Sequence, residues 1–199
     1  MSGLLSNFRN TMIVSFILAI VMVAGYLSHN GGADAIFWQA AFRWLHTFFG
    51  ILWVGLLYYF NFVQIRKMPD IPAELKPAVS KYIAPEALFW FRYAALATWI
   101  MGVILAWSRG YLVDAFALGL TSGNPQHTFI GVGMWLATIM FINVWAFIWP
   151  NQKIALGLVE GDADAKAKAG KLAMLFSRTN TLLSVPMLVT MTMNQTIFG

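Results

Sequence analysis

Residues 127–149 read HTFIGVGMWLATIMFINVWAFIW, and this stretch decides the fold. It contains no Asp, Glu, Lys or Arg. A helix rises about 1.5 Å per residue, so a helix over this stretch is long enough to cross the roughly 30 Å hydrocarbon core of a bilayer. Proline cannot donate the next backbone hydrogen bond. The stretch therefore predicts a transmembrane helix that stops at Pro150.

Four further apolar runs flank this one, at residues 11–28, 36–65, 85–108 and 174–198. The whole chain is 59% hydrophobic and only 11% charged, whereas soluble domains carry about 25% charged residues. We therefore predict an all-α fold, an integral membrane helical bundle of about five transmembrane helices. We expect these helices to form a single transmembrane domain over residues 1–199.

The distribution of positive charge predicts the topology. If the N-terminus is cytoplasmic, all but two of the thirteen Lys and Arg residues lie on the cytoplasmic side. The exceptions are Arg43 and Arg109. An excess of Lys and Arg is typical of cytoplasmic loops. The sequence therefore predicts a multi-pass protein of the bacterial inner (cytoplasmic) membrane with a cytoplasmic N-terminus.

The composition also excludes several classes of site. The chain has no Cys, which rules out disulfides, thiolate metal sites and a covalently attached c-type haem. The basic residues lie in short segments between apolar runs and are not gathered on one soluble face, so we expect no nucleic-acid partner. The expected partners are membrane lipids and a larger membrane protein complex or a cytochrome c.

One set of polar residues lies towards the predicted outer side. Arg43 and His46 are three residues apart and so share a helix face, while His127 begins another helix near the same boundary. Two imidazoles from different helices could ligate the iron of a haem b, with Arg43 pairing a propionate. The alternative is that His46 is a packed residue bonded to a neighbouring backbone carbonyl and that His127 is a hydrated cap.

A second set lies towards the predicted inner side. Asn143 and Asn180 each lie about 9 Å inside that boundary. Arg92 lies towards the same side, in the predicted helix at residues 85–108. A guanidinium with two carboxamides suits a planar, hydrogen-bonding anion, so these three residues are candidates for substrate binding. The alternative is that the asparagines form interhelical hydrogen bonds and that Arg92 extends to the headgroups.

Four stretches together carry a family resemblance: WLHTFFGILWVG at residues 44–55, PEALFWFRYAALATWIMG at 85–102, GVGMWLATIMFINVWAFIWPNQK at 131–153 and SRTNTLLSVPMLVTM at 177–191. In their order and in the positions of their prolines they resemble the membrane-embedded N-terminal domain of bacterial urate hydroxylases, the urate oxidase N-terminal domain family. The positions that look like matches to the family pattern are His46, His127, Asn143, Pro150, Asn151, Gln152, Arg178, Asn180 and Pro186.

The resemblance implies a membrane oxidoreductase that hydroxylates urate and passes electrons to a cytochrome c, which full-length family proteins carry as a fused C-terminal domain. This sequence carries no such domain, so the resemblance implies a separate cytochrome. The sequence departs from the family pattern at three positions, where Ala94, Thr179 and Gln195 replace a carboxylate and two histidines. These replacements remove three ionisable groups that could carry protons.

Two functions follow as hypotheses. The first is a urate-hydroxylase-like membrane subunit of an electron-transfer complex, respiratory or oxidoreductase in type. If it is catalytic, it is an oxidoreductase that needs a separate cytochrome. The second is a non-catalytic accessory or assembly subunit of a larger membrane complex, which the three lost ionisable groups favour.

Overall fold

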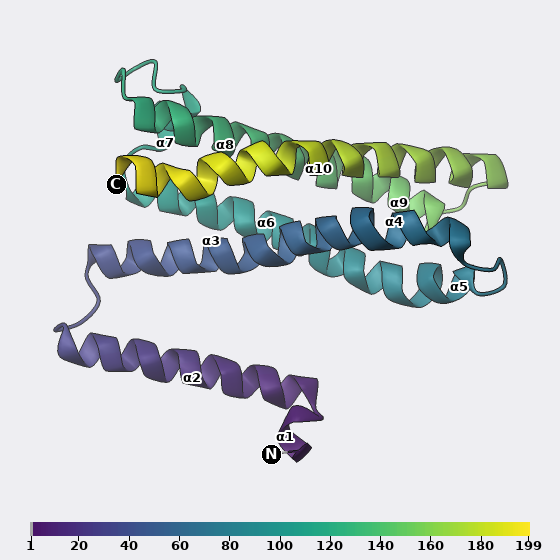
Figure 1. Ribbon diagram of the computed structural model, residues 1–199, viewed down its shortest axis with the longest axis horizontal. Coiled ribbons are helices and arrows are strands. Elements are labelled where there is room, and N and C mark those ends of the chain that lie inside the picture. The colour runs from purple at the N-terminus through teal and green to yellow at the C-terminus, as the bar shows by residue number, and fades with distance from the viewer. Residues whose placement is uncertain (1) are drawn as a thin grey trace. The chain divides into compact units, whose positions relative to one another are not determined.

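The computed structural model describes residues 2–199, which form helices and connecting loops without a β-strand (Figure 1). Five helical segments are long and apolar enough to cross a membrane, and they are Phe8–His29, Ala35–Asp70, Lys76–Ser108, Pro125–Ala155 and Ala163–Phe198. The predicted all-α membrane bundle with five spans is therefore confirmed. The cytoplasmic position of the N-terminus stays a prediction.

The chain divides into two compact units, of which the first runs to Ala40. It contains α1 (Ser2–Leu5), α2 (Phe8–His29) and the first turns of α3 (Ala35–Tyr58). The side chain of Asn7 caps α2 by accepting from the backbone N–H of Asn10, at 3.2 Å. No residue of α2 is buried, which is the surface expected of a helix surrounded by lipid acyl chains.

The second unit, Ala41–Gly199, contains the other spans. Its first span continues from α3 through η1 (Tyr59–Gln64) and α4 (Ile65–Lys67) to the short η2 (Met68–Asp70). The next combines α5 (Lys76–Ala78), η3 (Val79–Ile83) and α6 (Ala84–Ser108). After α7 (Leu112–Phe116) come α8 (Pro125–Ile142), η4 (Asn143–Ile148) and α9 (Trp149–Ala155), and then α10 (Ala163–Phe198).

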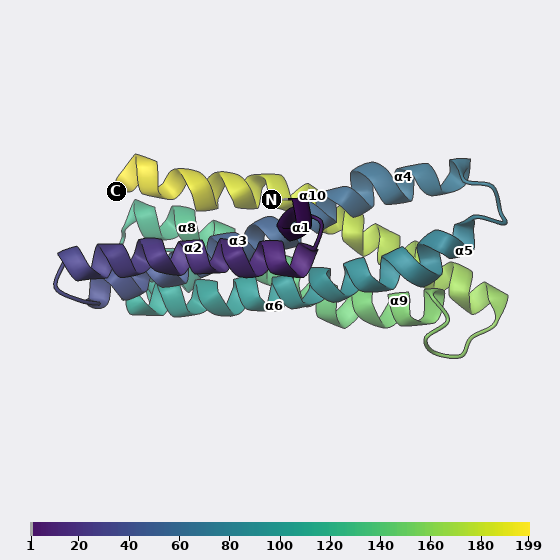
Figure 2. The same ribbon diagram turned by 90° about the horizontal axis from the view of Figure 1, so that it is seen from below.

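Two ends of this second unit are useful landmarks. Figures 1 and 2 place α7, the start of α8 and the C-terminus of α10 at one end, which we call the α7 end. They place α4, α5 and α9 at the other, which we call the α9 end.

Three helix ends differ by more than five residues from the sequence prediction, and the first of them is the start of the third span, which lies at Lys76 rather than residue 85. The fourth span does not stop at Pro150, because the helix passes through this residue and ends at Ala155. The segment before Pro150 is η4, a wider π-helix, and the carbonyl of Phe147 accepts a hydrogen bond from the side chain of Asn151 at 2.8 Å. The fifth span begins at Ala163 rather than near residue 174, where the carboxylate of Asp162 caps the helix.

The core of the second unit lies where α3, α6, α8 with η4, and α10 face one another. Its buried side chains are Trp53, Val54, Leu57, Phe60, Leu88, Phe91, Ala94, Ala95, Met140, Val144, Ile148 and Met187. Small residues let the helices approach closely. A Cβ atom on Gly131 would lie 2.0 Å from the carbonyl oxygen of Ala115, and one on Gly133 would lie 2.3 Å from Oγ1 of Thr190. These glycines hold α8 against α7 and α10.

Candidate functional site

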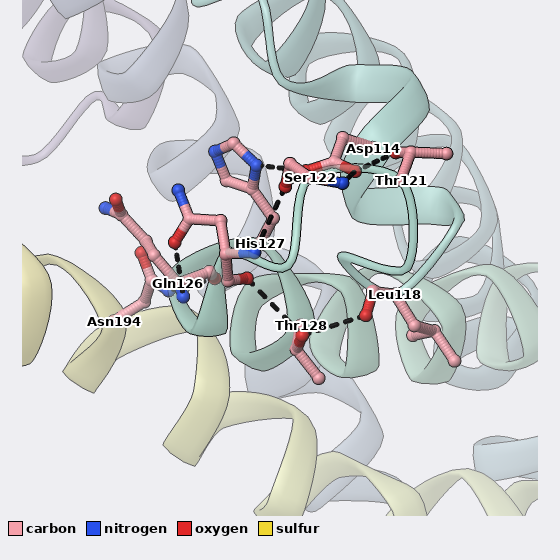
Figure 3. Close-up of polar contacts among 9 residues, drawn as sticks. Asp114, Leu118, Thr121, Ser122, Gln126, His127, Thr128 and Asn194 are labelled. Atoms are coloured by element: carbon pink, nitrogen blue, oxygen red, sulfur yellow. Dashed lines mark hydrogen bonds and ion pairs between the residues drawn. The ribbon is translucent and has the colours of Figure 1, made fainter.

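A single carboxylate organises the α7 end. Asp114 accepts hydrogen bonds from the hydroxyls of Thr121 and Ser122, from the backbone N–H of Ser122 at 3.1 Å, and from Nδ1 of His127 (Figure 3). The bonds from Ser122, Thr121 and His127 hold the pKa of Asp114 well below its usual range, so the carboxylate is ionised at neutral pH. Asp114 thereby ties the loop after α7 to the start of α8.

The carboxylate also sets the state of His127. Because Nδ1 donates to Asp114, the neutral ring has its unprotonated nitrogen at Nε2. The imidazole stacks on the ring of Tyr111, with 5.8 Å between centroids and 28° between planes. The side chains of His127 and Asp114 are 22% and 16% exposed, which leaves the pair within reach of a small molecule. An imidazole oriented by a carboxylate is suited to accept a proton at Nε2.

One guanidinium group lies close to the Tyr111 ring on which His127 stacks. Cζ of Arg109 lies 6.0 Å from the centroid of the Tyr111 ring. Burial raises the pKa of Tyr111, while the positive charges of Arg109 and Arg43 act in the opposite direction. Arg43 Nη1 also donates to Oε1 of Gln195 at 2.7 Å. We call Arg43, Arg109, Tyr111, Asp114, His127 and Gln195 the α7 cluster.

The C-terminal part of α10 is held at the same place. The side chain of Asn194 donates to the backbone carbonyl of Gln126 at 3.0 Å, and Figure 3 shows the two residues at the junction of α10 and α8. The α7 cluster therefore draws residues from α3, α7, α8 and α10. Arg43 and Arg109 together outweigh the charge of Asp114, so the cluster is suited to an anion.

The structure holds the two candidate haem ligands through different partners. His46 Nδ1 donates to the backbone carbonyl of Thr98 on α6 at 2.9 Å, which is the bond that the alternative interpretation predicts. Its ring fills the space beside Gly102, where a Cβ would lie 2.8 Å from it. In both His46 and His127 the bond at Nδ1 leaves Nε2 to ligate a metal, as is usual for such histidines. Each of these two residues could therefore offer Nε2 to a haem iron.

Two of the three residues predicted towards the inner side, Asn143 and Asn180, lie together in the structure. Asn143 Nδ2 donates to Oδ1 of Asn180 at 2.8 Å, and Asn180 Nδ2 donates to the carbonyl of Met140 at 2.9 Å. Both asparagines are buried. The guanidinium of Arg92 lies instead over the ring of Trp149, 3.8 Å from its centroid. The asparagines form the interhelical bond that the alternative interpretation predicts, and Arg92 is held by an aromatic ring.

Further polar side chains accompany the asparagines in the core. The hydroxyls of Tyr58 and Ser184 lie 3.0 Å apart, and Asn61 Nδ2 donates to the hydroxyl of Ser177 at 2.8 Å. Within residues 2–199, Oδ1 of Asn61 is buried without a hydrogen-bond partner. Asn61 lies in η1, and π-helical segments are rare and often occur near functional sites.

The three positions that depart from the family pattern lie in different surroundings. Ala94 is buried at 3% exposure in the core, where a carboxylate would need a partner. Thr179 is exposed and bonds to the carbonyl of Leu175 in its own helix. Gln195 belongs to the α7 cluster through its bond to Arg43. Only this last replacement lies at the candidate site.

Sequence reasoning missed several residues of the α7 end. Asp114, Tyr111, Thr121 and Ser122 were not predicted as site residues, because the stretch between the third and fourth spans has no strong periodicity. One signal was present: Asp114 is the only acidic residue between Arg109 and Trp149. A lone carboxylate between two membrane spans needs hydrogen-bond donors, and the hydroxyls that follow it could have been recognised as such.

Residues 120–198 match the protein family described as urate oxidase N-terminal. Over these residues the chain is similar to that family. The match takes in α8, η4, α9 and the whole of α10, and with them His127, Asn143 and Asn180. No curated protein and no solved structure matches the chain. Two of the four stretches that carry the resemblance, at residues 131–153 and 177–191, lie within the matched residues.

Proposed function

We propose that the chain is a urate-hydroxylase-type membrane subunit of an electron-transfer complex in the bacterial cytoplasmic membrane. In this proposal the α7 cluster binds an anionic purine such as urate. The observation that carries it is the Asp114–His127 pair, with Arg109 beside the stacked ring of Tyr111 and Arg43 bonded to Gln195, in a chain whose residues 120–198 match the urate oxidase N-terminal family. A base and an anion-binding charge in one place are what oxidation of an anionic purine requires.

Each residue of the α7 cluster has its own role in the proposed reaction. Arg43 and Arg109 offset the negative charge of the purine, and the ring of Tyr111 offers a face on which a planar substrate stacks. His127 accepts a proton at Nε2, and Asp114 stabilises the resulting imidazolium. Hydroxylation of urate by water releases two protons and two electrons. The protons leave through His127 and solvent, and the electrons pass one at a time to a separate c-type cytochrome.

Haem b is an alternative to the role of His127 as the base, because an Nε2 that ligates iron cannot also accept a proton. His46 and His127 are the residues that would hold it, and its iron would supply one-electron redox chemistry. A reduced-minus-oxidised absorption spectrum of the purified protein checks this point separately from substrate oxidation. A spectrum without a haem band, before and after addition of haem, would remove haem b from the proposal and leave the α7 cluster as the substrate site.

The experiment for the main proposal uses the purified protein in lipid nanodiscs with oxidised cytochrome c. We expect urate to reduce the cytochrome, and His127→Gln to slow this reduction by about 100-fold or more, because the base is lost. His29→Gln is the matched control, since His29 lies at the exposed end of α2. No reduction of cytochrome and no binding of urate by the wild-type protein would contradict the proposal.

The second candidate function is a non-catalytic accessory subunit of a larger membrane complex. The specific observation in its favour is that buried Ala94 and exposed Thr179 leave the membrane interior without two ionisable groups of the family pattern. Its test is co-purification in mild detergent. A stable larger assembly together with a protein that neither binds nor oxidises urate would favour this function over the first.

A further inference from the structure

A pair of cations at the α9 end shares one aromatic ring. Cζ of Arg92 lies 3.8 Å from the centroid of Trp149, and Nζ of Lys153 lies 5.7 Å from the same centroid. Arg92 also lies 5.0 Å from the ring of Tyr93 and 5.4 Å from that of Phe89. Stacking of a cation on aromatic faces fixes its position. Two positive charges are therefore held close together where α6 meets α9.

Neither cation has an acidic partner. In the part of the chain that the structure describes, the ion pairs are Lys67–Asp70 and Asp114–His127. The nearest carboxylate in the sequence of α6, Glu86, accepts from Nε1 of Trp90 at 2.8 Å. Stacking uses the face of a guanidinium and leaves its in-plane N–H groups able to donate. The pair is therefore prepared to bind an anion from outside the protein.

The position of the pair along the helices indicates where this anion comes from. Arg92 lies sixteen residues before the end of α6 at Ser108, or about 24 Å along the helix, while a hydrocarbon core is roughly 30 Å thick. The Arg92 side chain can thus reach the headgroup region from just inside the boundary. Trp149 lies about 36 Å from the start of α8 at Pro125, which is more than the thickness of the hydrocarbon core and places Trp149 in the headgroup region.

The surroundings of the pair are apolar and face outward. Phe89 and Tyr93 are 41% and 44% exposed, and in a membrane protein such rings face lipid. A free phosphate ion would gain nothing from them, whereas an acyl chain would cover them. We propose that Arg92, Trp149 and Lys153 form a binding site for the phosphate of an anionic phospholipid, whose acyl chains lie along Phe89 and Tyr93. Basic pockets between transmembrane helices bind such headgroups in other proteins.

The test is native mass spectrometry of the full-length protein in detergent, titrated with phosphatidylglycerol or phosphatidylcholine. We expect Arg92→Gln with Lys153→Gln to weaken phosphatidylglycerol binding by about tenfold or more, since each cation near the surface contributes about 1 kcal/mol. The control is Lys166→Gln with Lys168→Gln, which removes the same charge from the exposed start of α10. We expect this control to change binding by less than about twofold and phosphatidylcholine binding to be equal in all variants.

Two further measurements separate this proposal from misfolding and from binding of a free anion. Arg92→Lys keeps a cation on the rings and should retain most of the phosphatidylglycerol affinity, which separates loss of charge from misfolding. Equal weakening by both double variants would overturn the proposal, because net charge alone would then explain binding. Millimolar inorganic phosphate is added as a competitor of phosphatidylglycerol. If it competes in the wild-type protein but not in the variant with Arg92→Gln and Lys153→Gln, the site binds a free anion and the lipid assignment is overturned.

Discussion

The α7 cluster and the asparagine pair in the core are both polar groups in an apolar protein, but they are bonded in different ways. Asn143 and Asn180 are buried, and they bond to each other and to the carbonyl of Met140. The α7 cluster instead contains ionisable groups that stay partly exposed, and the unprotonated Nε2 of His127 is left for a substrate. A mutually bonded carboxamide pair stabilises the bundle, whereas an oriented but incompletely bonded group can do chemistry.

The largest effect should follow from loss of the carboxylate that orients His127. Asp114→Asn removes the acceptor of the Nδ1 proton and should lower urate-dependent reduction of cytochrome by about 10- to 100-fold. Asp70→Asn is the matched control, because Asp70 forms an exposed pair with Lys67. Equal rates for the two variants in nanodiscs would show that the Asp114–His127 pair is not part of a reaction site.

A substitution in α8 should disturb the α7 cluster through packing. A Cβ on Gly131 would lie 2.0 Å from the carbonyl oxygen of Ala115, so Gly131→Ala must push α7 away from α8. We expect a loss of about 1–3 kcal/mol in unfolding free energy and a weaker Asp114–His127 contact. Gly55→Ala is the control, since nothing lies within 4 Å of a Cβ there. Unfolding in detergent with increasing denaturant measures both variants.

The asparagine pair should show a smaller effect, and one confined to stability. Asn180→Ala leaves the side chain of Asn143 and the carbonyl of Met140 without a partner, which should cost about 1 kcal/mol in unfolding free energy. Replacing both asparagines by Leu should cost less than the sum of the single changes, because no polar side chain is then left buried. A large loss of urate oxidation at unchanged stability would show that the pair belongs to a site.

The smallest effect concerns pH. Because the pKa of Asp114 in the folded protein lies below its ordinary value of 3.8, its contribution to stability is complete above that value and is lost only as pH falls towards the folded pKa. Hydrogen exchange of the loop at residues 117–124 should therefore show the same protection at pH 7 and pH 5. In Asp114→Asn the loop should be less protected at both. A loop that opens between pH 7 and pH 5 in the wild-type protein would contradict this assignment.

Much of the architecture could be predicted from local composition. Each span contains a window with few charges, and the bilayer requires about twenty apolar residues for a crossing, so the number of spans follows from the sequence. The helix ends were less predictable. Proline disfavours an ordinary helix but is accommodated when the preceding turn widens, as η4 does before Pro150. A charged run such as residues 163–173 has no apolar signal, and the cap at Asp162 decides its start.

The candidate site was harder to predict because it depends on residues far apart in the chain. Depth along the helices correctly indicated that Asn143 and Asn180 could meet, since both were placed at one level. Depth alone did not indicate that Arg92 would lie over Trp149, because an Arg side chain can reach several turns. Asp114 was missed since its partners come from a loop without regular structure.

By itself, the sequence determined that this chain is a helical membrane protein with five spans, because hydrophobicity and length act locally and each span satisfies its own backbone hydrogen bonds. Only the tertiary structure decided which polar side chains meet, such as Arg43 with Gln195 and His127 with Asp114. The physical reason is that these pairs depend on how helices rotate and pack against one another. Small contacts such as that of Gly131 with Ala115 set this packing, and no local pattern encodes it.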